Sequence, residues 1–332
     1  MKSRRVIISA LMILLVLPSC RHKDDPVETS TYLSGVLSFT MPTFVLPGEE
    51  LTLVPSGAVN PTGDVGYSWS TSWTSKTDTT KTETGTGDGS WTVTVPSAIG
   101  PYTIYSNAFA SEYISLSASK DFYVIDPAYD VTLTGLSYQV DSTSLEDPRD
   151  GSVYYLATTG DKVWTQNNLY YQGSGVSYDY SPAIDALFGR LYTWEEAMEA
   201  CPEGWHLPSD AEFAELAGSY VEGSAFESGQ VFNEAAGVLM ANASFLGDRM
   251  WTFWPNVNIT DESKFSAIPI GYAVDYEGTL RFTGVKDYSV FWTSDEEEDF
   301  GIYRYIYVDK SNVFVGKGDK KSFRASVRCV KD

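Results

Sequence analysis

Apolar and polar residues alternate in short runs along the stretch from residue 32 to residue 127. The alternating positions are Leu51/Leu53, Val65/Tyr67/Trp69, Trp91/Val93/Val95, Ile114/Leu116/Ala118 and Phe122/Val124. When every second residue is apolar, one face of a β-strand is buried in a core. Turns such as Pro47-Gly48 and Gly100-Pro101 separate the runs. Roughly seven short strands over such a length predict an antiparallel β-sandwich.

The pattern changes to a helical period further along the chain. Thr193-Trp194-Glu195-Glu196 is a capping box, and apolar residues then recur on one face until Pro202 stops the helix. Ser209-Asp210-Ala211-Glu212 repeats the device, with Gly223 beyond the second helix. Strand-like segments surround both helices at residues 153–157, 163–165, 291–293, 303–308, 313–315 and 325–330. We therefore predict a mainly β, multidomain chain whose second domain is α+β with two short helices.

The N-terminal residues resemble an export signal. The apolar run Val6–Leu17 is too short for a spanning helix, which needs about 20 residues, but fits the core of a secretory signal. Leu17-Pro18-Ser19-Cys20 then resembles the lipobox of bacterial lipoproteins. The resemblance implies that residues 1–19 are a signal peptide and that Cys20 is lipidated. The alternative is an ordinary signal peptide that happens to end in a cysteine.

The charged segment after Cys20 bears on localisation. Lys23-Asp24-Asp25 resembles the signal that sends lipoproteins of Bacteroidetes-type bacteria to the outer face of the outer membrane, although a solvated charged tether would look the same. We expect residues 20–31 to be a tether and the protein to be lipid-anchored in the outer membrane, exposed at the cell surface. We expect the protein to contact the membrane through its N-terminal lipid.

The composition of the chain limits the kinds of molecule that it can bind. The 332 residues include 23 Lys and Arg against 44 Asp and Glu, a net charge of −21, and loss of the three cations in residues 1–19 leaves −24. Such an acidic surface repels phosphate backbones, so we expect no nucleic-acid partner. Apolar residues make up 43% and aromatic residues 14% of the chain. This content supports folded cores, and the many tyrosines and tryptophans suit β-rich surface proteins.

Two cysteines remain if Cys20 carries lipid. An exported protein meets oxidising conditions, and Cys201 and Cys329 allow a single intramolecular pairing. Two buried free thiols are the alternative.

Two phrases in the alternating region resemble the immunoglobulin-like PKD family. They are Tyr67-Ser68-Trp69, similar to its tryptophan strand, and Gly100-Pro101-Tyr102-Thr103-Ile104, similar to a late strand. The resemblance implies an immunoglobulin-like domain over residues 32–127. A polar connector, residues 128–145, would follow it.

The C-terminal half resembles the Fibrobacter succinogenes major paralogous domain over residues 146–332. The phrases that carry the resemblance are Asp147-Pro148-Arg149-Asp150-Gly151, Val163-Trp164-Thr165-Gln166-Asn167-Asn168-Leu169, Gly189-Arg190-Leu191-Tyr192-Thr193-Trp194, Cys201-Pro202-Glu203-Gly204-Trp205-His206-Leu207-Pro208-Ser209-Asp210, Phe265-Ser266-Ala267-Ile268-Pro269-Ile270-Gly271-Tyr272, Phe291-Trp292-Thr293-Ser294 and Ser326-Val327-Arg328-Cys329. The family is thought to be related to C-type-lectin-like and formylglycine-generating-enzyme-like folds. In lectin-like domains the helix cysteine pairs with the terminal one, which favours a Cys201–Cys329 disulfide.

Candidate chemistry is sparse. His22 and His206 are the two histidines, and His206 with Ser209 or Asp210 is better explained as part of a turn and a helix cap than as a catalytic set. No metal-ligand spacing occurs, and the sugar-binding calcium motifs of lectins are missing. We therefore expect no catalytic residues, cofactor or metal. The acidic run of residues 295–299 offers oxygens to Ca²⁺ but lacks the spacing of a dedicated loop.

Two loops are the candidate ligand-binding site. Phe245, Trp251, Phe253 and Trp254 lie in one loop, where they serve either as stacking surfaces or as core. The other holds Asp295, Glu296, Glu297, Glu298 and Asp299. We expect the two loops to form one exposed face far from the tether. The leading function is a non-enzymatic binding or adhesion module for a glycan or protein. The alternatives are a carbohydrate-active enzyme or accessory protein of polysaccharide utilisation, or a structural envelope component.

Overall fold

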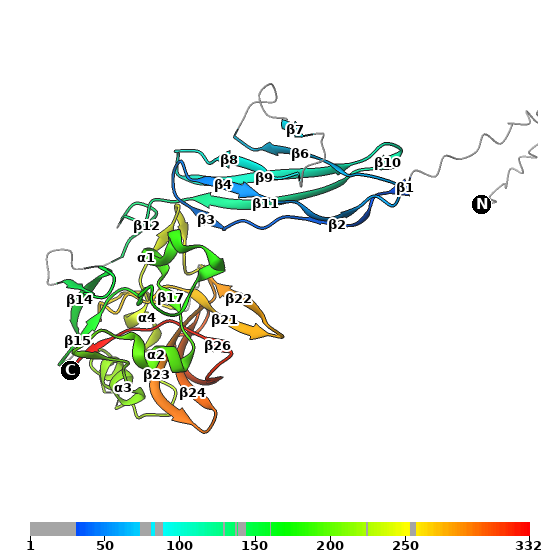
Figure 1. Cartoon of the computed structure of the whole chain (residues 1–332). Helices are drawn as coiled ribbons and strands as arrows, with labels where there is room; N and C mark the ends of the chain where they lie inside the picture. The colour runs from blue at the N-terminus through cyan, green and yellow to red at the C-terminus, as the bar shows by residue number, and fades with distance from the viewer. Residues whose placement is uncertain are drawn as a thin grey trace, which may run out of the picture.

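The computed structural model describes residues 31–73, 81–83, 89–128, 130–136, 138, 144–159, 161–223, 225–252 and 257–332. The predicted signal peptide, Cys20, Lys23-Asp24-Asp25 and Trp254 lie outside these residues. The chain is a mainly β, multidomain protein with few short helices. Figure 1 shows an elongated N-terminal β domain set across one end of a rounder C-terminal domain. Within the described residues, no helix has the length and apolar character needed to cross a membrane.

The N-terminal β domain is built from two layers of strands. Its strands are β1 (Thr31–Tyr32), β2 (Ser34–Ser38), β3 (Phe44–Val45), β4 (Glu50–Leu53), β5 (Ser56–Val59), β6 (Gly66–Thr71), β7 (Lys81–Glu83), β8 (Trp91–Thr94), β9 (Gly100–Phe109), β10 (Tyr113–Ile114) and β11 (Leu116–Val124). One layer is the sheet β3-β11-β9-β6-β7. The strand pairs β4-β8 and β2-β5 are not hydrogen-bonded to that sheet, and β4-β8 packs against it across the core. The alternating residues Leu53, Trp69 and Phe122 meet in the core, and Trp69 Nε1 donates a hydrogen bond to the Gly89 carbonyl at 3.0 Å.

The C-terminal domain combines two larger sheets with short helices. Its strands are β12 (Leu133–Thr134), β13 (Ser144–Glu146), β14 (Val153–Thr159), β15 (Lys162–Thr165), β16 (Val176–Ser177), β17 (Arg190–Leu191), β18 (Trp205–His206), β19 (Ser244–Phe245), β20 (Asp248–Arg249), β21 (Ile270–Tyr276), β22 (Thr279–Val285), β23 (Tyr288–Glu297), β24 (Phe300–Tyr307), β25 (Val313–Asp319), β26 (Phe323–Arg324) and β27 (Val330–Lys331). The helices are α1 (Asp185–Phe188), α2 (Trp194–Ala200), α3 (Asp210–Gly218) and α4 (Ala236–Leu239), with 3-10 turns η1 (Tyr178–Tyr180) and η2 (Pro182–Ile184). One sheet has the order β13-β14-β15-β27-β18 and the other β22-β21-β23-β24-β25, with β26 beside β21.

Both predicted capping boxes form. Thr193 Oγ1 accepts from the Glu196 backbone N–H at 3.2 Å, and the Glu196 carboxylate accepts from the Thr193 N–H at 2.8 Å. Ser209 and Glu212 make the same reciprocal pair at the start of α3. The prediction of two short capped helices is therefore confirmed.

A disulfide closes the C-terminal domain. Cys201, directly after α2, is bonded to Cys329, directly before β27, and their Cα atoms lie 5.9 Å apart. Cys329 is fully buried in a cluster with Trp194, Ala197 and Leu207. The bond therefore holds the end of α2 against the last strand.

Part of the expected connector belongs to the C-terminal domain. Residues of β12 pair with β19, with Leu133 opposite Phe245. Leu133 and Leu136 are buried in a cluster that also holds Ile125 and Phe44 of the N-terminal β domain. The buried Leu133 and Leu136 therefore anchor the chain at the junction of the two domains.

Phe44 is the centre of this junction. Its ring lies 5.8 Å from that of Phe188 and 5.7 Å from that of Phe245, both edge-on. The backbone N–H groups of Thr43 and Phe44 both donate to Ser181 Oγ, at 2.9 and 3.2 Å. Apolar burial and paired backbone groups thus join the two domains along one side of η2.

Phe44→Ala is expected to uncouple the two domains. Removing the ring leaves a cavity between them, so heating should give two unfolding transitions in place of a shared one. Calorimetry checks this, and Val36→Ala, an exposed position on β2 of the same domain, is the control that should change nothing. One undivided transition in Phe44→Ala would contradict the coupling.

Candidate ligand-binding site

A row of tyrosines lies on one face of β24. Tyr303, Tyr305 and Tyr307 are half-buried, whereas the residues between them, Arg304 and Ile306, are buried on the opposite face. This is the alternation of a strand, which sends successive side chains to opposite sides of a sheet. Three tyrosine side chains therefore point to the same side of the sheet.

Neighbouring strands add further rings. Tyr288 of β23 lies opposite Tyr307, with the two ring centroids 4.7 Å apart. Phe314 of β25 lies opposite Tyr305 and stacks on it at 5.1 Å. Tyr303 stacks on Phe323 at 4.9 Å with the ring planes 7° apart. The rings come from four separate strands and form one continuous surface.

Gly316 makes room for this arrangement. It lies opposite Tyr303 on β25, and a Cβ atom there would come within 2.4 Å of the Tyr303 ring. Any other residue would therefore push the ring out of its position over the strand.

We call the resulting hollow the tyrosine groove. It has a volume of about 390 Å³. Its walls are Tyr272, Tyr288, Val290, Tyr303, Tyr305, Tyr307, Lys310, Phe314 and Phe323. Its walls are thus almost entirely aromatic, with one charged side chain. Such a lining is typical of sites that bind a ligand by stacking and a few placed polar groups.

The five tyrosine hydroxyls of the groove are free to bind. In the described part of the chain none of them makes a hydrogen bond to another residue. Burial raises the pKa of Tyr288 and of Tyr303 above the ordinary 10.0, so both stay protonated at neutral pH. Each hydroxyl can both donate and accept.

The groove offers side chains only. β24 pairs with β23 on one side and with β25 on the other, so its backbone groups are already used. A ligand would therefore meet ring faces, hydroxyls and the Lys310 ammonium.

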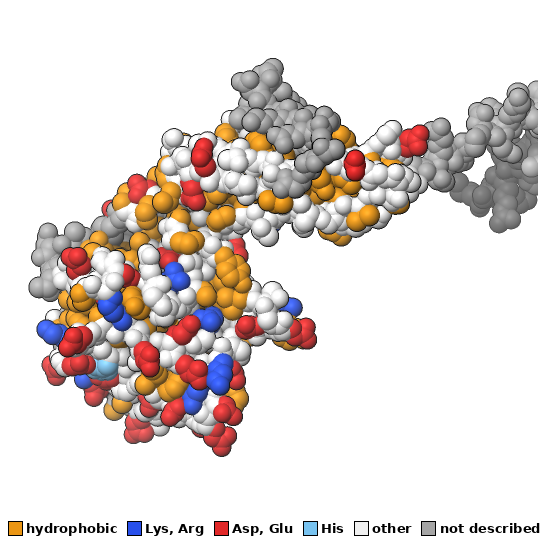
Figure 2. All heavy atoms as spheres, viewed as in Figure 1, with side chains coloured by type: hydrophobic (Ala, Val, Ile, Leu, Met, Phe, Trp, Pro, Cys, Tyr) orange, Lys and Arg blue, Asp and Glu red, His pale blue; other side chains and the backbone are white. Residues whose placement is uncertain are grey.

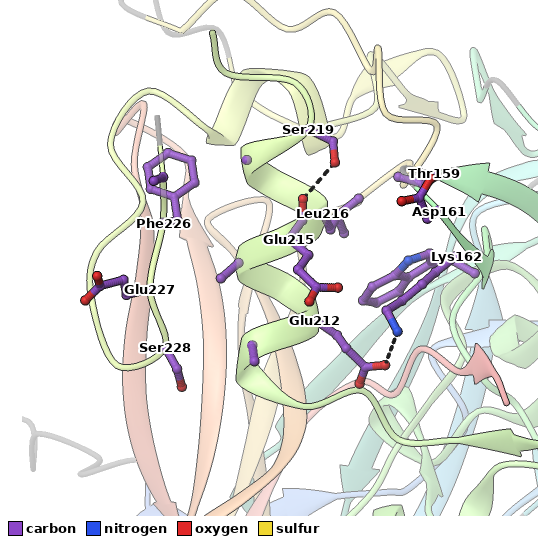
Figure 3. Close-up of a pocket in the computed structure, with 15 residues that line it drawn as sticks. Thr159, Asp161, Lys162, Glu212, Glu215, Leu216, Ser219, Phe226, Glu227 and Ser228 are labelled. Carbon is purple, nitrogen blue, oxygen red and sulfur yellow. Dashed lines mark hydrogen bonds and ion pairs between the residues drawn. The ribbon is translucent and has the colours of Figure 1, made fainter. Parts of the chain in front are cut away.

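A second hollow lies beside α3, and Figure 3 shows its walls. It has a volume of about 600 Å³. Glu212 and Glu215 reach it from α3, and Ser219 directly follows that helix. Asp161 lies in the turn between β14 and β15, Lys162 begins β15, and the 225–228 segment closes the far side. We call it the α3 pocket.

Glu212 of the α3 pocket is held by several partners. Burial would raise its pKa, but hydrogen bonds from the Ser209 backbone, Lys162 and His206 outweigh it and lower the pKa to about 2. The carboxylate is therefore ionised at neutral pH.

His206 lies between two carboxylates. Nδ1 is 2.7 Å from Asp332 Oδ1, and Nε2 is 3.1 Å from Glu212 Oε1. Burial lowers the pKa of His206, but these hydrogen bonds outweigh it and raise the pKa above 6.5. The Ser209 hydroxyl donates to Glu212 at 2.9 Å, not to His206, so no serine–histidine pair is formed. Among the described residues, no group of three His, Cys, Asp or Glu side chains could hold a metal ion.

The structure gives Trp251 a core position. It is 2% exposed, and its indole N–H donates to the Ala267 carbonyl at 3.2 Å. The prediction that Trp251 offers a stacking face is therefore wrong, because its ring packs inside the domain. The apolar core was the alternative for this segment, whereas Trp254 and Phe253 lie outside the described residues.

The acidic run of residues 295–299 forms the end of the β23–β24 hairpin. Asp295 accepts a hydrogen bond from the Asp210 backbone N–H at 2.6 Å, while Glu296 and Glu297 pair with Lys320 and Lys317. The hairpin points away from the N-terminal β domain in Figure 1, whereas Phe245 packs against Phe44. Among the described residues of the two predicted loops, Phe245 therefore lies at the junction with the N-terminal β domain, away from the acidic hairpin.

The tyrosine groove was not among the predicted sites. The available signal was the alternation Tyr303-x-Tyr305-x-Tyr307 within the predicted strand of residues 303–308. Alternation alone indicates one aromatic face. It does not reveal that Tyr272, Tyr288 and Phe314 join it from other strands.

The fold and its hollows define a mainly β protein with a disulfide-closed C-terminal domain. Residues 146–331 match the Fibrobacter succinogenes major domain, and the chain belongs to this family. No curated protein and no solved structure matches the chain.

Proposed function

We propose that this chain is a non-enzymatic binding protein and that its C-terminal domain takes a ligand in the tyrosine groove. One observation carries the proposal: five tyrosine hydroxyls without partners in the described chain line a single aromatic hollow. Tyrosine provides large contact area together with a polar group, which is why it is enriched at binding surfaces. A glycan or a protein segment would fit this chemistry.

An enzyme is the second candidate, and the α3 pocket is where it would have to act. Its central carboxylate, Glu212, is ionised and bound to Lys162 and Ser209. His206 and Ser209 both make hydrogen bonds to Glu212, but among the described residues no hydrogen bond joins the histidine to the serine. The arrangement therefore favours a structural role for Glu212, and we propose binding instead of catalysis. A purely structural role in the envelope would not explain why five tyrosine hydroxyls without partners in the described chain line one groove.

We further propose that the protein is displayed at the cell surface by lipid on Cys20. The lipobox-like Leu17-Pro18-Ser19-Cys20 and the Lys23-Asp24-Asp25 segment support this localisation. The two-layered N-terminal β domain, proposed to be immunoglobulin-like, would space the binding domain from the membrane. A C-type-lectin-like relation of the C-terminal domain is supported by the capped helices α2 and α3 and by the disulfide from the end of α2 to the last strand.

Cys20→Ser is expected to abolish lipid anchoring, because diacylation requires the thiol. Metabolic labelling with palmitate and fractionation of membranes measure the effect. The label should disappear from the variant, with Cys201→Ser as the control that keeps it. Undiminished label in Cys20→Ser would contradict the lipoprotein proposal.

Tyr305→Ala is expected to remove ligand binding, because it deletes the central ring of the tyrosine groove. Glycan and protein arrays probed with the wild-type protein identify binders, and the variant should lose about tenfold or more in affinity for them. Tyr276→Ala is the matched control, since Tyr276 is an exposed tyrosine of the same domain outside the groove. Equal binding by Tyr305→Ala and wild type would place the site elsewhere.

A further inference from the structure

We infer that the ligand of the tyrosine groove is an uncharged oligosaccharide chain lying along the row Tyr303, Tyr305 and Tyr307. The inference rests on the proposed function and adds the class of ligand. Four features support it: the aromatic ring faces, the hydroxyls that both donate and accept hydrogen bonds, the backbone of β24 that is already paired within the sheet, and the negative charge of the surrounding surface.

The chemistry of the walls matches a sugar chain. Aromatic faces pack against the C–H surfaces of sugar rings, and phenol hydroxyls exchange hydrogen bonds with sugar hydroxyls because both groups donate and accept. The row is long enough for several sugar units. From Tyr303 to Tyr307 the strand rises about 13 Å, at roughly 3.3 Å per residue.

A peptide fits the groove less well. Peptides that bind sheets commonly add a strand to an open edge and use its backbone groups. Here β24, which carries the tyrosine row, is bordered by β23 and β25, so the row lies on the face of the sheet and not along an edge strand. A peptide ligand would leave its own backbone groups to pair with tyrosine hydroxyls alone.

The charges favour a neutral chain. Lys310 is the one charged residue of the groove walls, and its Nζ lies 3.5 Å from Asp309 Oδ1, which offsets its charge. Carboxylates are spread over the surface of the C-terminal domain seen in Figure 2, and the whole chain has a net charge of −21. This field repels a polyanion and leaves an uncharged ligand unaffected.

The experiment titrates the full mature chain with neutral oligosaccharides of one to six units, drawn from β-glucan, xylan, mannan and α-glucan panels. Uronic-acid chains of the same lengths and proline-rich peptides are run in parallel. Affinity for the neutral binder should rise from one unit to about four and then level off, and should change little between low and high salt.

Two substitutions of Tyr305 distinguish the contribution of its hydroxyl from that of its ring. Tyr305→Phe keeps the ring and loses one hydroxyl, so affinity should fall about two- to tenfold, whereas Tyr305→Ala should lose more than that. Tyr276→Ala is the control and should bind as wild type. Because Tyr305→Phe preserves the packing, it remains informative if Tyr305→Ala proves unstable.

The outcomes distinguish the two levels of the claim. Tighter binding of uronic-acid chains or of peptides, lost in Tyr305→Ala, overturns the neutral-sugar inference and keeps the groove as the site. Binding of any probe that survives both Tyr305 substitutions overturns the groove itself. Neutral chains bound with the expected dependence on length and on Tyr305 support both.

Discussion

Replacement of Arg304 by alanine is expected to lower the free energy of unfolding by about 3–5 kcal/mol, the usual cost of leaving one partner of a buried ion pair alone. Arg304 lies on the buried face of β24, and both it and Asp210 at the start of α3 are almost fully buried. Its Nη2 donates to Asp210 Oδ2 at 2.7 Å, and its Nη1 donates to the Gln230 carbonyl. Urea unfolding of the variant and of the wild type measures the difference.

Acid unfolding gives a second readout of the same pair. Burial would raise the pKa of Asp210, but the hydrogen bonds from Arg304 and from the Gly229 backbone outweigh it and lower the pKa below 3.8. A lowered pKa stabilises the fold above pH 3.8, and this contribution disappears as the pH falls through the folded-state value. Without Arg304 the acid transition should therefore move to higher pH.

Lys317→Ala is the matched control for this pair. Lys317 of β25 pairs with Glu297 at the end of β23, where both side chains are at least half exposed. An exposed pair contributes about 1 kcal/mol or less. Equal losses in Arg304→Ala and Lys317→Ala would contradict the role given to the buried pair.

Removal of the Cys201–Cys329 disulfide is expected to be comparably costly. The bond joins cysteines 128 residues apart, and a closed loop of this size contributes about 4–5 kcal/mol in the chain-entropy model. The double variant Cys201→Ala/Cys329→Ala should therefore unfold at lower urea concentration than the wild type. Reductant should destabilise the wild type and leave the double variant unchanged. Two titratable thiols in the oxidised wild-type protein would contradict the bond.

Features set by neighbouring residues were predictable from the sequence. The capping boxes at Thr193 and Ser209 each join two residues three positions apart, so the local sequence contains both partners of the motif. The strand alternation at Leu51/Leu53 and Tyr303–Val308 is equally local, because a strand turns each side chain by a fixed step.

Features set by distant residues were not predictable in this way. The sequence left Trp251 open to two roles, core packing first and an exposed stacking surface second, and contacts made across the fold bury it. Phe44 reads as one more strand residue, whereas its partners Phe188 and Phe245 lie more than a hundred positions away. The tyrosine groove depends on the register of β23, β24 and β25, which places Tyr288 opposite Tyr307 and Phe314 opposite Tyr305.

The most direct test of the central claim is a titration, followed by NMR, of the protein carrying ¹³C-labelled tyrosine rings with the best ligand from the arrays. Ring resonances are assigned through single Tyr→Phe substitutions. Ligand is expected to shift the resonances of the groove tyrosines and to leave those of Tyr276 and the buried Tyr192 unchanged. The groove tyrosines are Tyr272, Tyr288, Tyr303, Tyr305 and Tyr307. A ligand that binds fully while these five resonances stay in place would contradict this expectation.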